Sequence, residues 1–318
     1  MSSLLPTPSN IIKQVNHIIF TFLWKGKDKV TRISTINTLE EGGIKMIDIE
    51  SMIKALRLAW LKRIFNNNNS TWKFYLIHLL KQLGGLLIFE CNYAIKDLPA
   101  ISIFYRELLI WWSEFRDLFF EEKYWLSIIW NNKDIRINGK PVFYKTYYNS
   151  GVCTVYDLLL NLNNIDSFNV ITKKNKKVNF LTWTGLRHSI PSNLKSAEHK
   201  FDSRLPYFKC NNVVFDISKK RSKDFYSLIV SRKAQLPNNA KKLRQNFNLT
   251  EEELKLAFAL PHKVVYEPYV KAFQYKILNS ILYTNKKLFK IGYSEHDKCT
   301  FCDNVSETLH HLFFYCSF

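Results

Sequence analysis

Apolar residues recur at three- and four-residue intervals along much of the chain, which is the spacing of amphipathic helices. The clearest examples are residues 10–24 and 50–65, and in the second of these Lys54 and Arg57 lie mostly off the apolar stripe. The same pattern predicts helices over 71–83, 101–119, 121–130, 154–160, 223–234, 239–247 and 264–282. Thr250 with Glu253 forms a capping box, so another helix should begin at Glu251. The sequence therefore predicts a mainly helical protein.

Strand signals are few. Alternating apolar residues over 134–144 flank Asn138-Gly139, a pair that favours a two-residue hairpin turn. Gly42-Gly43 predicts a second turn, and residues 162–222 have poor periodicity, so we expect loops and short pieces there. We divide the chain into a helical region 1–130, a mixed basic linker region 131–250 with the hairpin, and a helical segment 251–318 that ends in a cysteine and histidine cluster.

Composition narrows the class of protein. Of 318 residues, 47% are hydrophobic, which supplies enough apolar material for a core and excludes disorder throughout. No apolar run approaches the roughly 20 residues that a membrane span requires. The net charge is +19, and residues 171–250 carry 18 Lys and Arg against 4 Asp and Glu. Such an excess favours nucleic acid or an anionic membrane surface as a partner. Of the two we prefer nucleic acid, because no basic amphipathic helix with a clean apolar face stands out in the sequence.

The basic residues fall into clusters that would contact phosphates. The predicted nucleic-acid-binding residues are Lys173, Lys174, Lys176, Lys177, Lys219, Lys220, Arg221, Lys223, Lys241, Lys242, Arg244, Lys286 and Lys287, with Lys290 beside the last pair. Aromatic residues lie among them, and we expect Trp183 or Tyr207 to stack on unpaired bases. The alternative interpretation is that the lysines are solvated loop charges and the aromatic residues belong to the core.

Three of the six cysteines gather near the C-terminus as Cys299, Cys302 and Cys316, with His310 and His311 between them. Thiolates and imidazoles are the ligands that tetrahedral zinc prefers, and a Cys-x-x-Cys turn places two sulfurs on one side. We prefer His311 to His310 because its offset from Cys316 is nearer to one helical turn. Cys299, Cys302, His311 and Cys316 are therefore predicted to hold one structural Zn²⁺. The alternative is a chance grouping of buried thiols.

Signatures of catalysis are missing from the sequence. It contains no Asp-Asp pair for two-metal chemistry, no phosphate-binding Gly-x-x-x-x-Gly-Lys loop and no Gly-x-Ser-x-Gly elbow. We therefore predict no catalytic residue and no enzyme activity for this chain.

Three segments carry a resemblance to a known family. The first runs from Phe22-Leu-Trp-Lys through Glu41-Gly-Gly-Ile to the Ala55–Trp60 helix, and the second joins Lys271–Asn279 to Thr284-Asn285-Lys286. The third is the Cys/His knuckle with the phrase Glu307-Thr-Leu-His-His-Leu-Phe-Phe-Tyr-Cys316. Together they resemble the region after the polymerase core in LINE-class, non-LTR retrotransposon reverse transcriptases, and the resemblance covers nearly the whole chain.

The resemblance implies that residues 1–130 are the post-thumb region and that the knuckle and basic linker hold template RNA and target DNA during target-primed reverse transcription. It supports His311 as the zinc ligand. It also implies that the catalytic aspartates and the endonuclease lie upstream of Met1, so we expect a non-catalytic fragment. The expected partners are RNA, DNA and the upstream polymerase core where present, with no membrane or small-molecule substrate. The expected location is intracellular, in a cytoplasmic or nuclear ribonucleoprotein.

Other hypotheses stay open at this point. A zinc-braced helical module could bind an acidic protein partner through its basic face. The chain could be a relic that folds poorly and exposes the apolar face of its first helix. A nuclease has the least support.

Overall fold

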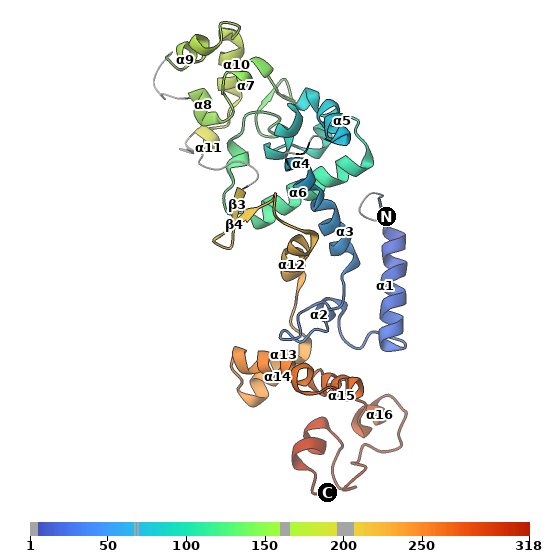
Figure 1. The fold of residues 1–318 in the computed structure, drawn as a ribbon. Coiled ribbons are helices and arrows are strands. Elements are labelled where there is room, and N and C mark those ends of the chain that lie inside the picture. The colour runs from blue at the N-terminus through green and yellow to red at the C-terminus, as the bar shows by residue number, and fades with distance from the viewer. Residues whose placement is uncertain (1–5, 67, 69, 160–165, 196–206) are drawn as a thin grey trace. The chain divides into compact units, whose positions relative to one another are not determined.

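The computed structural model describes residues 6–66, 68, 70–159, 166–195 and 207–318 (Figure 1). Helices dominate these residues, and the strands among them form two short antiparallel hairpins, which confirms the predicted mainly helical fold. The chain divides into two units. The aromatic unit is built on Met52–Leu228, and the knuckle unit on Pro8–Ser51 together with Ile229–Phe318. The division into three consecutive regions stays a sequence prediction.

The chain passes from one unit to the other within α3 (Ile49–Leu58) and α12 (Ser222–Lys233). Between them, the α-helices of the aromatic unit are α4 (Trp60–Phe65), α5 (Thr71–Leu79), α6 (Ile103–Phe119), α7 (Lys145–Asn149), α8 (Val155–Leu159), α9 (Asp166–Lys174), α10 (Phe180–Ser189) and α11 (Ser192–Lys195). Short 3-10 turns are η1 (Lys81–Leu83), η2 (Gly85–Glu90), η3 (Ile95–Asp97) and η4 (Tyr124–Ser127).

Large rings fill the core of the aromatic unit. Trp112 and Trp130 are fully buried, and each indole N–H donates to a backbone carbonyl, at 2.7 Å for Phe89 and 2.9 Å for Val152. The guanidinium of the fully buried Arg116 lies over the rings of Tyr93 and Trp125, and its Nη1 donates to the Cys91 carbonyl at 2.9 Å. Because a buried donor without an acceptor is costly, the bonds from Trp112 and Arg116 fix how η2 and Cys91 pack on α6.

Two hairpins belong to the aromatic unit. β1 (Arg136–Ile137) pairs with β2 (Lys140–Pro141) across Asn138-Gly139, whose φ angles of 52° and 72° confirm the predicted turn. β3 (Tyr207–Cys210) pairs with β4 (Val213–Asp216) in a second hairpin that the sequence analysis did not predict. Its turn is Asn211-Asn212, with both φ angles positive, and Asn is among the few residues that tolerate this conformation. The Asn211-Asn212 pair is therefore the feature of the sequence that could have predicted this hairpin.

The helices of the knuckle unit are α1 (Ser9–Trp24), α2 (Arg32–Thr35), α13 (Asn238–Phe247), α14 (Glu251–Val264), α15 (Pro268–Leu278) and α16 (Asn285–Lys290), followed by the π-helical turn η5 (His311–Tyr315). The orange helices α13, α14 and α15 pack on one another, and Ala240, Leu254 and Phe258 form their small buried core (Figure 1). Thr250 and Glu253 form both bonds of the predicted capping box at the start of α14.

The Gly42-Gly43 turn shows why its sequence is glycine at both positions. Gly42 has a φ of 77°, and a Cβ there would lie 2.8 Å from the Pro237 ring. A Cβ on Gly43 would lie 2.2 Å from the Asn37 carbonyl oxygen. The first position needs a left-handed backbone and the second a close backbone approach, and glycine meets both demands.

Several predicted boundaries differ from the structure. The helix predicted over 121–130 is only the short turn η4, and the 50–65 helix is interrupted at Ala59 between α3 and α4. The stretch 162–222 is more ordered than predicted, because it contains α9, α10 and the β3–β4 hairpin. Parts of that prediction, at 162–165 and 196–206, lie outside the described residues. None of the helices in the described part of the chain has both the length and the apolar character that crossing a membrane requires.

Candidate metal centre

The four predicted zinc ligands come together at the C-terminal end of the knuckle unit. One ligand atom from each of Cys299, Cys302, His311 and Cys316 lies within 4.8 Å of the others. The Cys299 and Cys316 Sγ atoms are 3.8 Å apart, and the Cys302 Sγ lies 3.2 Å from the His311 Nε2. Tetrahedral zinc with bonds of roughly 2.3 Å to sulfur and 2.0 Å to nitrogen separates its ligand atoms by about 3.5–3.8 Å. A disulfide would need about 2.05 Å between sulfurs. The cluster therefore fits a metal.

Local backbone geometry places the first two sulfurs. Lys298 and Ser306 form an antiparallel bridge, and the Cys299 N–H donates to the Val305 carbonyl at 2.8 Å. This closes a tight loop in which Asp303 has a φ of 55°. The Cys302 sulfur accepts hydrogen bonds from the backbone N–H groups of Asn304 and Val305. The bond from Asn304 has the largest effect, and together these bonds outweigh desolvation and lower the pKa of Cys302 to about 6. The loop thus favours the thiolate, which is the form that binds metal.

The structure separates the two neighbouring histidines. His311 is 8% exposed, begins the π-helical turn η5 and directs its Nε2 at Cys302. His310 is exposed, and its ring contacts those of Phe314 and Tyr315 instead. The preference for His311 over His310 therefore agrees with the geometry. Because four protein ligands fill a tetrahedron and leave no open position, the site has the make-up of a structural zinc centre.

A buried carboxylate that the sequence analysis missed supports the site. Glu307 is 6% exposed and accepts hydrogen bonds from the Thr300 N–H at 2.9 Å, the Thr300 hydroxyl at 2.8 Å and the Asn285 N–H at 2.7 Å. Burial raises the pKa of Glu307, but these bonds outweigh it and hold the pKa below its ordinary value. Glu307 therefore ties the start of α16 to the turn between Cys299 and Cys302. The sequence gives only a weak hint, an acidic residue between the ligand pairs.

The predicted basic residues fall in both units. Lys173, Lys176 and Lys177 of the aromatic unit are exposed, as are Lys219, Arg221 and Lys223, whereas Lys220 is half-buried. The side chain of Lys174 lies outside the described residues. In the knuckle unit Lys241, Lys242, Arg244, Lys286 and Lys290 are exposed. The role of these residues in binding nucleic acid stays a prediction.

Lys287 differs from its neighbours. Its Nζ donates to the Ser280 carbonyl and, at 3.2 Å, to the Leu282 carbonyl, and burial lowers its pKa. The ammonium group therefore stabilises the loop before α16.

Several of the aromatic residues between the basic clusters belong to the core. Trp183 is 3% exposed, and Phe208 and Phe225 are 2% and 0% exposed, so the prediction that Trp183 stacks on bases is wrong. Its indole packs against Phe168 and Phe180. Tyr207 is 48% exposed on the edge of the β3–β4 hairpin and stays available.

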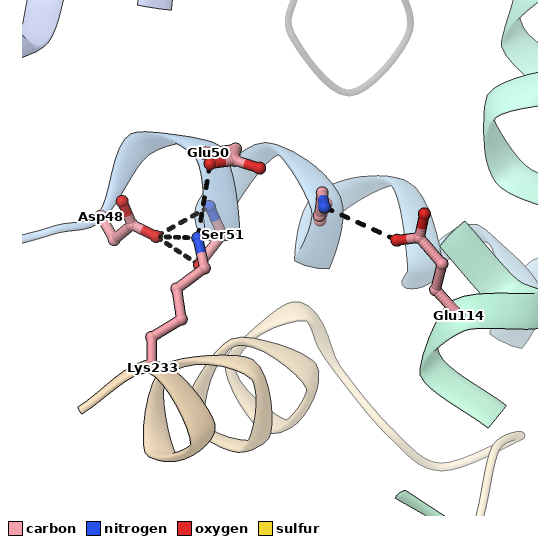
Figure 2. Close-up of polar contacts among 6 residues, drawn as sticks. Asp48, Glu50, Ser51, Glu114 and Lys233 are labelled. Atoms are coloured by element: carbon pink, nitrogen blue, oxygen red, sulfur yellow. Dashed lines mark hydrogen bonds and ion pairs between the residues drawn. The ribbon is translucent and has the colours of Figure 1, made fainter. Parts of the chain in front are cut away.

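A second polar cluster in the knuckle unit was also missed. Figure 2 shows Lys233 of α12 reaching Asp48, with an Nζ–Oδ2 distance of 2.8 Å, and Glu50 at 3.4 Å. Asp48 also accepts hydrogen bonds from the N–H and hydroxyl of Ser51, so it caps the first turn of α3 (Figure 2). These contacts join the two sequence segments of the knuckle unit.

Comparison with known proteins bears on the last part of the chain. A search of curated proteins found no match. Residues 241–318, which contain the four ligands, match a protein family described as zinc-binding in reverse transcriptase. That match concerns the zinc-binding region and not a polymerase domain. The C-terminal quarter of the chain is therefore similar to the zinc-binding region of reverse transcriptases, and its Cys/His cluster fits one structural zinc.

Proposed function

We propose that this chain binds RNA or DNA through its zinc-braced knuckle unit, as a non-catalytic part of reverse-transcriptase machinery of the LINE class. The observation that carries the proposal is the joint occurrence, within residues 241–318, of a four-ligand zinc cluster and a match to a reverse-transcriptase zinc-binding region. The LINE class rests on the resemblance of the three sequence segments. Its expected partners are template RNA, target DNA and a polymerase core inside the cell.

Charge supports a polyanionic partner. The chain has a net charge of +19, and α13 presents Lys241, Lys242 and Arg244 to solvent. Each phosphate that such residues neutralise releases counterions, so affinity should fall linearly with the logarithm of salt concentration. The zinc would act by holding the backbone of 299–316 in place, because a segment this short needs the metal to keep its fold.

A salt series tests this proposal. Binding of zinc-loaded protein to single-stranded RNA, single-stranded DNA and duplex DNA is measured by fluorescence anisotropy from 50 to 300 mM salt. Lys241→Ala, Lys242→Ala and Arg244→Ala in one chain should flatten the slope by about 0.7 per lost contact with a single strand. The equivalent triple change at Lys219, Lys220 and Arg221 reports on the aromatic unit. Folded, zinc-loaded protein that binds no nucleic acid at 50 mM salt would rule the proposal out.

One observation favours a second function, recognition of a protein. A groove of about 270 Å³ runs between α14 and α15 and is lined mainly by apolar side chains, including Leu260, Val264 and Ile277. Leu260 and Val264 are 49% and 63% exposed. The affinity for a protein partner bound in this groove would depend only weakly on salt concentration. Val264→Asp would lower the affinity for that partner and leave the affinity for nucleic acid unchanged.

A further inference from the structure

Four rings form an exposed patch where α13 ends beside the zinc-bearing turn η5. We call this patch, made of Phe247, His310, Phe314 and Tyr315, the aromatic platform. The ring centroids of His310 and Tyr315 are 4.6 Å apart, those of His310 and Phe314 5.6 Å, and those of Phe247 and Phe314 5.9 Å. The zinc ligands His311 and Cys316 bracket two of these residues in sequence, so the metal fixes the backbone that carries them.

The platform faces solvent. Phe314 and Tyr315 are 66% and 68% exposed and Phe247 is 43% exposed, whereas the rings in the aromatic unit's core are buried. The planes of the platform rings are inclined by 44–51°, so the rings do not cover one another as a parallel stack would. Exposed rings that contact one another, instead of lying singly on the surface, indicate a candidate binding surface.

The platform continues into a positively charged helix face. α13 carries Lys241, Lys242 and Arg244 and no acidic residue. Arg244 precedes Phe247 by three residues, which places the two side chains as neighbours on one face, and Lys241 lies one turn before Arg244. A line of cations that leads to exposed rings complements a chain of phosphates with accessible bases. An uncharged or basic protein surface would not satisfy these cations.

We infer that the aromatic platform is a stacking site for the unpaired bases of single-stranded RNA or DNA, with Lys241 and Arg244 contacting the flanking phosphates. This inference rests on the proposed function and adds the residues and the strand type. Bases inside a duplex are already stacked on one another and cannot lie on protein rings, whereas single strands stack on aromatic side chains with little regard to sequence. His310 lies outside the four-ligand cluster, and we assign it to the platform instead.

The test compares zinc-loaded wild type with Phe314→Leu on 12-nucleotide oligouridine, oligothymidine and a duplex of equal length. Leu keeps apolar bulk at this position but removes the ring. Tyr266→Ala is the matched control, since Tyr266 is 93% exposed on the same unit. Phe314→Trp restores a stacking ring, and Tyr315→Ala is a second variant. Zinc stoichiometry and the far-ultraviolet circular dichroism spectrum establish that each variant is folded.

We expect Phe314→Leu to weaken single-strand binding by about five- to 150-fold, the loss that removal of one base–aromatic stack produces. Duplex affinity and the salt slope should stay unchanged, because stacking releases no counterions. Phe314→Trp should retain tight binding, and the two oligonucleotides distinguish RNA from DNA. If Phe314→Leu and Tyr315→Ala both bind single strands as tightly as Tyr266→Ala does, the platform is not a stacking site, although the proposed function stands. Equal losses on single strands and duplex also overturn the inference, and a wild type that binds no nucleic acid overturns both proposals.

Discussion

The carboxylate of Glu307 bonds to Thr300 twice, accepting its backbone N–H at 2.9 Å and its hydroxyl at 2.8 Å. Thr300 follows the zinc ligand Cys299, so a buried anion holds the metal-binding turn from outside the ligand set. The second oxygen of the same carboxylate accepts from the Asn285 N–H at 2.7 Å, at the first residue of α16. One side chain thus positions both the turn and a basic helix.

Glu307→Gln should weaken zinc binding by about 10- to 100-fold, the usual effect of removing a group that orients metal ligands. In the glutamine variant one of the two carboxylate oxygens becomes an NH₂ group. This group faces the donors of either Thr300 or Asn285 and cannot accept their hydrogen bonds, so those donors are left unsatisfied. Competition with a chromophoric chelator measures the affinity. Glu295→Gln, at an exposed carboxylate in the same unit, is the matched control. Equal zinc affinity in the two variants would contradict a positioning role for Glu307.

The sequence was a good guide where the determinants are local. The zinc ligands are recognisable because a Cys-x-x-Cys turn and a nearby His and Cys suffice to describe them. The capping box at Thr250 and the Asn138-Gly139 turn are likewise local, and the structure contains both.

The sequence was a poor guide where burial depends on distant segments. Trp183 lies between two threonines in sequence but packs into the core through α10. In sequence Lys287 cannot be distinguished from its neighbour Lys286. In the folded chain the carbonyls of Ser280 and Leu282 lie close enough to accept hydrogen bonds from Lys287. The structural role of Glu307 becomes visible only in the fold, where its two carboxylate oxygens accept hydrogen bonds from Asn285 and Thr300. Such contacts follow from tertiary packing, which neither periodicity nor composition reports.

His311→Ala should abolish stoichiometric zinc binding, and His310→Ala should leave one zinc per chain. Only the His311 imidazole approaches Cys302, at 3.2 Å, whereas the His310 ring contacts Phe314 and Tyr315. Mass spectrometry under native conditions reports the zinc content of each variant. Retention of zinc by the first variant together with loss from the second would mean that the two histidines exchange roles.

Removal of zinc should loosen residues 297–316 and leave the aromatic unit folded. The ligands close a segment with little buried apolar surface of its own, so the metal supplies most of its order. Hydrogen exchange in the presence of a chelator should increase over 297–316. Tryptophan emission should keep its maximum, because seven of the eight tryptophans, all except Trp24, lie in Met52–Leu228. A red-shifted emission maximum on chelation would show that the aromatic unit depends on the metal.

The ion pair between Asp48 and Lys233 should make the stability of the knuckle unit depend on pH. Burial raises the pKa of Asp48, but hydrogen bonds from Lys233 and Ser51 outweigh burial and lower it. Burial likewise lowers the pKa of Lys233, and contacts with Asp48 and Glu50 raise it above its ordinary value. The carboxylate therefore stabilises the fold above its unfolded pKa of about 3.9, and the ammonium does so below about 10.4. The contribution is lost as pH falls through the folded pKa of Asp48 or rises through that of Lys233.

Lys233→Met should lower the free energy of unfolding at pH 7 by at most about 1 kcal/mol, because water screens this half-exposed pair. The difference from wild type should shrink as the pH falls below about 3.9 and through the lowered folded pKa of Asp48, because protonation of this carboxylate removes the pair in wild type as well. Urea denaturation at successive pH values measures both effects. Lys255→Met is the matched control, since its pair with Glu251 on α14 is exposed, and we expect a smaller change. A Lys233→Met difference that stays constant from pH 7 through the acid range in which Asp48 of wild type becomes protonated would show that Lys233 acts through its aliphatic packing and not through its charge.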